Sequence, residues 1–364
     1  MRNIFEKEED KQIEIPKVER KLTTVSYDYS VEFIVNLMTK ESPKIILEVP
    51  FQRQFIWKQD RCSKLIESLI MNVPIPPLYF SEEEDGKWLV VDGLQRLNAI
   101  KTFYQNEYAL KNLDIINELE KLKYKDLPPK SKRLLDNGLL RINVIKYDSH
   151  PDIKYDIFMR LNTGAVSLNN QELRNCLYRG IFNETIKNVV KDKEVLKLLN
   201  LKKPHSRYLD VEFVIRYLAF SENLRKNENG YYVENYKGSL KSFINSFMEK
   251  HKNIDHEKAN KLKQKFLNTV KKYFIVFDSN EGLRNPASRS KQINKALADC
   301  ILLSLEQYNE EILKQYKEDI TNLRNELLSD NEFISLISKR TSDTVNVKKR
   351  ITIWFERLEN VINL

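Results

Sequence analysis

The chain has 364 residues, 41% of them hydrophobic, so it is long enough to bury two hydrophobic cores. No window approaches the ~18 consecutive apolar residues of a membrane span, and the charged first ten residues lack the apolar stretch of a secretory signal. The three cysteines are odd in number and far apart, which excludes a disulfide framework or a zinc site and favours the reducing cytoplasm.

The formal net charge of +9 is unevenly distributed along the chain. Residues 1–150 hold 24 basic and 24 acidic side chains, whereas residues 151–364 hold 37 and 28. A neutral first part joined to a basic second part indicates that any anionic partner, such as DNA, contacts the second part. Solvation of helices by lysine and glutamate explains the same excess equally well.

The first part of the chain alternates short strands and helices. Residues 1–20 are charged and unpatterned, which predicts a mobile tail. The elements predicted after it are a helix over 29–38 with Ser30 as its cap, a strand over 45–49, a helix over 60–71, strands over 78–80 and 88–91, a helix after Asp92-Gly93, and a strand over 139–147. This pattern predicts a small mixed α/β domain over residues 21–149.

After Ser149 the strand signals largely stop. Helical periods cover about 157–162, 169–178, 208–222, 237–250, 257–277, 291–307, 309–328 and 344–362. Turn signals such as Asn229-Gly230 separate them. The fold class is therefore predicted to be α+β, with an all-α, net basic helical domain over residues 150–364.

The turn after the strand at 88–91 is the first candidate site. The strand runs into Asp92-Gly93 and then into a helix, whose first N–H groups have no intrahelical acceptor and therefore suit an anion. Arg96 adds a guanidinium suited to phosphate, while Asp92 is placed to hold Mg²⁺ or cap the helix, and Gln95 to orient a water. An Asp-Gly pair is equally a plain turn, and Arg96 can equally form a salt bridge.

Several further blocks occur before and after this turn. In chain order the blocks are Pro50-Phe51-Gln52-Arg53, Val73-Pro74-Ile75-Pro76-Pro77, Asp92-Gly93-Leu94-Gln95-Arg96, Arg160-Leu161-Asn162-Thr163-Gly164 and Gln171-Glu172-Leu173-Arg174-Asn175. Together they resemble the prokaryotic ParB/sulfiredoxin-like "DGQQR" family, which is related to the S portion of GmrSD-type, modification-dependent restriction systems.

The resemblance implies a small ParB/sulfiredoxin-like domain, binding and hydrolysis of a nucleoside triphosphate with Mg²⁺, and defence against foreign DNA. It implies that Asp92, Gln95 and Arg96 are the catalytic residues and that Asp92 also holds the Mg²⁺. The nucleotide- and phosphate-binding residues that it implies are Gln52, Arg53, Gly93, Arg160, Asn162, Thr163, Gly164, Gln171, Glu172 and Arg174.

Two positions depart from the family pattern. Leu94 stands where the motif has its first Gln, and Ala165 replaces a second Gly.

One hypothesis is a nucleotide-binding, nucleotide-hydrolysing sensor or regulator of an anti-phage or restriction system, which acts on DNA. The other is a non-catalytic module that binds DNA or a partner through the same fold, which the loss of the amide at Leu94 favours.

The helix predicted over 257–277 is the candidate nucleic-acid surface. It carries Lys258, Lys261, Lys265 and Lys272 at spacings that place them on one face. A solvated face of an amphipathic helix has the same pattern. Trp57 could stack on a base, although an aromatic side chain at such a position is more often part of a core.

Nuclease chemistry finds no support in the sequence. The four histidines are His150, His205, His251 and His256, and the last two are five residues apart, so they cannot share a helix face as metal ligands do. DNA cleavage is therefore expected to belong to a partner nuclease or effector chain.

Overall fold

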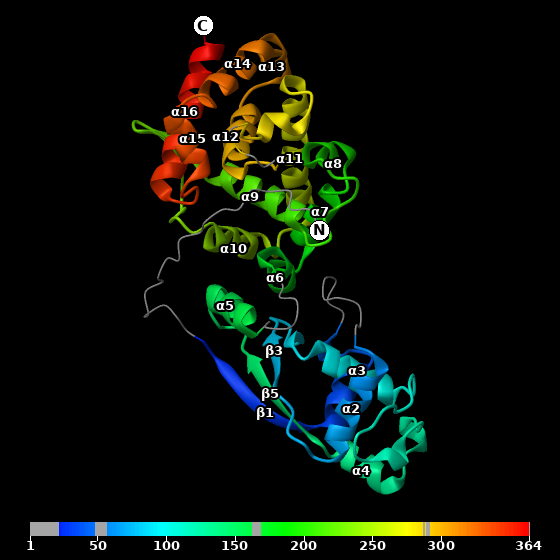
Figure 1. Ribbon diagram of the computed structural model, residues 1–364. Helices are drawn as coiled ribbons and strands as arrows, with labels where there is room; N and C mark the ends of the chain where they lie inside the picture. The colour runs from blue at the N-terminus through cyan, green and yellow to red at the C-terminus, as the bar shows by residue number, and fades with distance from the viewer. Residues whose placement is uncertain (1–21, 48–56, 162–168, 287, 289–291, 364) are drawn as a thin grey trace. The chain divides into compact units, whose positions relative to one another are not determined.

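The computed structural model describes residues 22–47, 57–161, 169–286, 288 and 292–363 (Figure 1). The predicted tail over residues 1–20 lies outside them. The chain divides into two compact units, an N-terminal unit from Pro16 to Leu168 and a C-terminal unit that contains Asn169–Leu364. Helix α5 (Pro151–Leu161) contacts a strand of the N-terminal unit, so this division lies after α5 rather than after Ser149.

A five-stranded mixed sheet forms the centre of the N-terminal unit, with the order β1-β5-β3-β4-β2. The strands are β1 (Thr24–Ser30), β2 (Ile45–Ile46), β3 (Leu78–Glu82), β4 (Trp88–Asp92) and β5 (Leu139–Ile145). β1 pairs antiparallel with β5, β5 parallel with β3, β3 antiparallel with β4, and β4 parallel with β2. Because β3 and β4 are antiparallel, with Tyr79 opposite Asp92, the turn that follows β4 lies next to the segment that leads into β3.

Helices pack against one face of this sheet. They are α1 (Val31–Thr39), α2 (Gln59–Ile70), α3 (Leu94–Tyr104) and α4 (Pro129–Asp136), with short 3₁₀ turns η2 (Asn117–Leu119) and η3 (Tyr124–Asp126) (Figure 1). Alternate strand residues such as Phe80, Trp88 and Val90 enter the same hydrophobic core as the buried faces of these helices. This core fixes the position of α3, which begins at the candidate turn.

Local sequence signals predicted most of this unit. The Ser30 cap is confirmed, since its Oγ accepts a hydrogen bond from the Phe33 N–H at 3.2 Å. Strand β1 was not predicted, although Val25, Tyr27 and Tyr29 alternate with polar residues in the pattern of a half-buried strand. The predicted strand over 45–49 is described only for Ile45–Ile46.

The C-terminal unit is mostly helical. Its helices are α6 (Asn170–Leu177), α7 (Ile181–Val189), α8 (Lys193–Leu199), α9 (Leu209–Asn223), α10 (Leu240–His251), α11 (His256–Val276), η4 (Asn280–Leu283), α12 (Lys295–Glu306), α13 (Glu310–Gln315), α14 (Lys317–Leu327), α15 (Asn331–Ser338) and α16 (Thr344–Ile362). Helix α12 is buried along almost its whole length and contacts α9, α11 and α16. The predicted α+β class is confirmed.

Three details of this unit differ from the sequence prediction. Helices α7, α8 and α15 were missed, and the predicted helix over 309–328 is two helices that meet at Tyr316. The unit is also not entirely α-helical, because β6 (Leu224–Asn227) and β7 (Gly230–Val233) form a hairpin. The Asn229-Gly230 turn signal marks this hairpin, whose strand β7 is anchored to α16 by two hydrogen bonds between Tyr231 and Thr352.

Candidate functional site

The turn between β4 and α3 has the geometry of a helix N-terminus that opens directly from a buried strand. Gly93 takes the left-handed conformation, with φ of 101°, and a Cβ atom there would overlap the Leu78 side chain. The Leu97 N–H donates to the Gly93 carbonyl at 2.9 Å, so α3 begins at Leu94. The turn therefore requires glycine for both conformation and space, as the predicted strand–turn–helix arrangement implies.

Arg96 anchors the proline-rich segment before β3 to this turn. Its guanidinium donates to the carbonyl oxygens of Pro76 and Pro77, the latter at 3.1 Å, and forms an ion pair with Asp92 at 2.8 Å. Only 12% of its side chain is exposed, and burial lowers its pKa although Asp92 acts in the opposite direction. Arg96 was predicted to contact phosphate, but its guanidinium donates to protein carbonyls and to Asp92.

The Asp92 carboxylate is the more accessible polar group of the turn. Its Oδ2 atom accepts from Arg96, whereas its Oδ1 atom has no partner among the described residues, and 43% of the side chain is exposed. Within the described ranges, no three His, Cys, Asp or Glu side chains are grouped to hold a metal ion. Asp92 could therefore supply one carboxylate ligand, and other ligands would have to come from a bound molecule or water.

Leu94, Gln95 and Trp57 lie close to this turn and have structural contacts. Leu94 packs against the hydrophobic core, which explains how an apolar residue is accommodated where the family motif has Gln. The Gln95 Oε1 atom accepts from the Trp57 N–H at 3.3 Å. The Trp57 ring packs against the core, and the Arg61 guanidinium lies 4.3 Å from the centroid of the ring. Trp57 is therefore a partly buried core residue, which was the more frequent of its two interpretations.

Several other predicted site residues lie outside the described part of the chain. They are Gln52, Arg53, Asn162, Thr163 and Gly164. Arg160 is described and lies exposed in the last turn of α5.

The remaining predicted site residues, Gln171, Glu172 and Arg174, are buried in α6 of the C-terminal unit. Asn169 and Glu172 form a capping box, in which each side chain accepts a hydrogen bond from the other's backbone N–H. Glu172 also pairs with Arg207 at 2.7 Å. The segment from Asn169 to Arg174 therefore begins α6 and joins it to the segment before α9. The sequence pattern alone does not distinguish this structural role from ligand binding.

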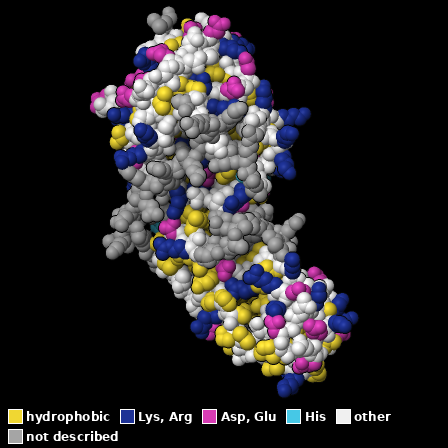
Figure 2. Space-filling view, viewed as in Figure 1, with side chains coloured by type: hydrophobic (Ala, Val, Ile, Leu, Met, Phe, Trp, Pro, Cys, Tyr) yellow, Lys and Arg dark blue, Asp and Glu magenta, His cyan; other side chains and the backbone are white. Residues whose placement is uncertain are grey.

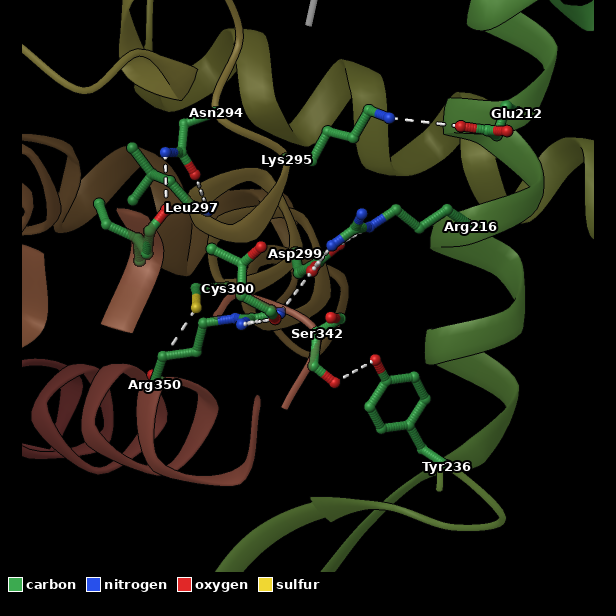
Figure 3. A network of polar contacts seen from close by, with 12 residues as sticks. Glu212, Arg216, Tyr236, Asn294, Lys295, Leu297, Asp299, Cys300, Ser342 and Arg350 are labelled. Atoms are coloured by element: carbon green, nitrogen blue, oxygen red, sulfur yellow. Dashed lines mark hydrogen bonds and ion pairs between the residues drawn. The ribbon is translucent and has the colours of Figure 1, made fainter. Parts of the chain in front are cut away.

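Arg174 holds α6 against two other helices. Its Nε donates to the Asn245 side chain at 2.9 Å, and its Nη1 pairs with Glu212 at 2.8 Å. Glu212 also pairs with Lys295 at 3.3 Å (Figure 3). Burial acts to raise the pKa of Glu212, but the charges of Lys295 and Arg174 outweigh burial and lower this pKa to about 2.

We expect protonation of Glu212 in acid to lower the unfolding free energy of the protein. Because its folded-state pKa lies below its ordinary value, its contribution is complete above pH of about 4.5 and is lost as the pH falls towards 2. Linkage predicts a loss of about 2 kcal/mol of unfolding free energy between pH of about 7 and about 3. Urea unfolding of the wild type and of Glu212→Gln at both pH values measures this difference in unfolding free energy. The variant should lose about 2 kcal/mol less than the wild type between the two pH values. Equal losses in both proteins would contradict the prediction.

The four lysines predicted to contact nucleic acid all have protein partners. Lys258 pairs with Asp255 at 3.4 Å, Lys261 with Glu257 at 2.7 Å, and Lys265 with Glu306 at 2.8 Å. The Lys272 ammonium donates to the Glu306 carbonyl at 2.8 Å, and burial lowers its pKa. The positive charge of this α11 face is therefore largely compensated, which favours the solvated-face interpretation.

None of the helices in the described ranges has both the length and the apolarity needed to cross a lipid bilayer.

Comparison with known proteins finds a family similarity for part of the chain. A family model described as the GmrSD restriction endonuclease N-terminal domain matches residues 34–179. A solved structure of a Pnob8-like ParB-N domain is 14% identical, with 94% of this chain and 99% of that chain covered and a TM-score of 0.23. No curated protein matches the chain. Residues 34–179 are therefore similar to the N-terminal domain of GmrSD restriction endonucleases, in agreement with the resemblance of the ordered sequence blocks.

Proposed function

We propose that this restriction-system module binds a nucleoside triphosphate with Mg²⁺ at the turn between β4 and α3, and that nucleotide binding regulates its action on DNA. The family match over residues 34–179 supports a role in restriction. The observation that carries the nucleotide proposal is the open Oδ1 atom of Asp92 beside the N-terminus of α3. A carboxylate beside the N-terminal end of a helix suits a phosphate that carries a divalent cation.

In this proposal the side chains of the turn have separate tasks. Asp92 supplies one oxygen ligand to Mg²⁺, since Mg²⁺ is commonly bound by one or two carboxylates together with substrate phosphates. Gly93 lets the ligand approach the backbone, and Arg96 positions the turn through the carbonyls of Pro76 and Pro77. If the protein also hydrolyses the triphosphate, Gln95 is placed to orient the attacking water.

A non-catalytic module that binds DNA or a partner chain is the second candidate. Two observations favour it: Leu94 is packed against the core, and the Arg96 donors are engaged by the protein itself. In this case the chain would bind nucleotide without turnover, or not at all, and DNA cleavage would belong to a partner nuclease. Phosphate release in the presence of Mg²⁺ distinguishes the two candidates.

Calorimetric titration with ATP, GTP, CTP and UTP tests the nucleotide site. We expect Mg²⁺-dependent binding of at least one of them, weakened about 10–100-fold by Asp92→Asn, which removes the charge and keeps the shape. Asp85→Asn is the matched control, because Asp85 is also an exposed acid paired with a neighbouring cation, Lys87, but lies in the β3–β4 turn. No binding of any of the four nucleotides, or equal weakening by both variants, would refute the proposed site.

A further inference from the structure

The second half of the chain has more basic than acidic side chains, and this excess of positive charge does not lie on the face of α11 that carries Lys258, Lys261 and Lys265. That face is compensated by Asp255, Glu257 and Glu306. The segment from Val190 to Pro204, which covers α8 and the loop after it, contains five lysines and only two acidic residues. The segment that contains α8 therefore has a net positive charge.

The lysines around α8 are exposed and have no carboxylate partner among the described residues. The ammonium groups of Lys193, Lys202 and Lys203 have neither a hydrogen bond nor an ion pair there, and the Lys191 ammonium donates only to the side-chain oxygen of Asn188. We define the α8 lysine face as Lys191, Lys193, Lys197, Lys202, Lys203 and Lys271. Figure 2 shows Lys and Arg side chains protruding at the edge of the C-terminal unit where Figure 1 places α8.

Packing holds these lysines on a fixed support. The apolar residues Val195, Leu198 and Leu199 of α8 are buried, and α8 contacts α11. The Lys197 ammonium lies 4.2 Å from the ring centroid of Phe274, a residue of α11. Lys271 is one helical turn before Phe274, so α8 and α11 contribute to the same face.

The two acidic residues of the segment offset only part of the charge of its five lysines. Asp192 caps α8, and one of its carboxylate oxygens accepts from the N–H groups of Glu194 and Val195 at 2.9 and 3.4 Å. Glu194 is the other acidic residue, and it lies in the first turn of α8. The face therefore presents several ammonium groups to solvent with one exposed carboxylate that is not used in capping.

We propose that the α8 lysine face binds the phosphate backbone of duplex DNA, and this inference rests on the proposed role in restriction. Lysine is a compact point charge that neutralises phosphates without reading bases, so the contact is expected to be independent of sequence. Three of the four large apolar residues of α8 are buried and the fourth, Leu196, is only partly exposed, which disfavours a membrane as the partner. DNA bound here by its backbone would be positioned while sequence or modification is recognised elsewhere.

Fluorescence anisotropy of a labelled duplex with the full chain, in the absence of nucleotide, tests the α8 lysine face. The triple variant Lys193→Gln, Lys202→Gln, Lys203→Gln should bind about 10–100-fold more weakly at ~0.1 M salt, and the slope of log affinity against log salt should fall by about 2–3. The control Lys258→Gln, Lys261→Gln, Lys317→Gln removes three exposed lysines that each have a carboxylate partner. This control should retain most of the affinity and the slope.

Three outcomes would overturn the inference: no DNA binding by the wild type at low salt, equal weakening in both triple variants, or binding of phosphatidylserine vesicles in place of DNA. Circular dichroism of both variants verifies that they are folded. Calorimetry with nucleotide on the same preparations separates this inference from the proposed function. Nucleotide binding without DNA binding refutes only the α8 lysine face, and DNA binding without nucleotide binding refutes only the nucleotide site.

Discussion

Replacement of Asp299 by alanine is expected to lower the unfolding free energy of the C-terminal unit by about 3–5 kcal/mol. Asp299 pairs with Arg216 through two hydrogen bonds of 2.8 and 2.7 Å and with Arg350 at 3.2 Å (Figure 3). All three side chains are at most 4% exposed. Without the carboxylate, two buried guanidinium groups would face each other with no counter-charge, and α9, α12 and α16 would lose the link that joins them.

Urea unfolding followed by circular dichroism measures this loss. Asp319→Ala is the control, because Asp319 is exposed in the first turn of α14 and should cost less than about 1 kcal/mol. Asp299→Asn keeps the shape and one acceptor, so it should lie between the two. A loss below about 1 kcal/mol for Asp299→Ala would show that the arginines find other acceptors or reach solvent.

Arg96→Ala is expected to destabilise the N-terminal unit by about 2–4 kcal/mol and to weaken triphosphate binding as a consequence. The substitution removes the hydrogen bonds to the Pro76 and Pro77 carbonyls and the ion pair to Asp92. Because the guanidinium is largely buried, its removal leaves these acceptors with reduced access to water. The segment before β3 would then no longer be held against the turn that begins α3.

Tryptophan fluorescence during urea unfolding measures the expected loss of stability, and nucleotide calorimetry measures the expected weakening of triphosphate binding. Arg96→Lys should rescue only partly, since one ammonium group cannot reproduce the planar arrangement of donors. Arg133→Ala is the control, as Arg133 is exposed in the last turn of α4 and should cost less than about 1 kcal/mol. If Arg96→Ala abolishes nucleotide binding without loss of stability, then Arg96 contacts the phosphate directly, as the sequence resemblance implies, and does not act by positioning.

The sequence by itself determined the α+β class, the resemblance that the family model supports over residues 34–179, and many of the local elements. Helix caps, hydrophobic periods and the strand–Asp-Gly–helix turn depend on residues within one or two turns of one another, so they can be recognised in a linear pattern. The Ser30 cap and the start of α3 after Gly93 are examples. The charge excess of the second half was also apparent, but its location was not.

Only the tertiary structure decided which polar side chains are available to a ligand. Lys265 on α11 meets Glu306 on α12, and Arg96 meets the carbonyls of Pro76 and Pro77, about 20 residues earlier in the chain. Arg174 is buried against Asn245 and Glu212, which its family motif does not reveal. Whether a charged residue is paired, buried or exposed depends on which distant elements pack beside it, and that packing is set by the core as a whole rather than by local spacing.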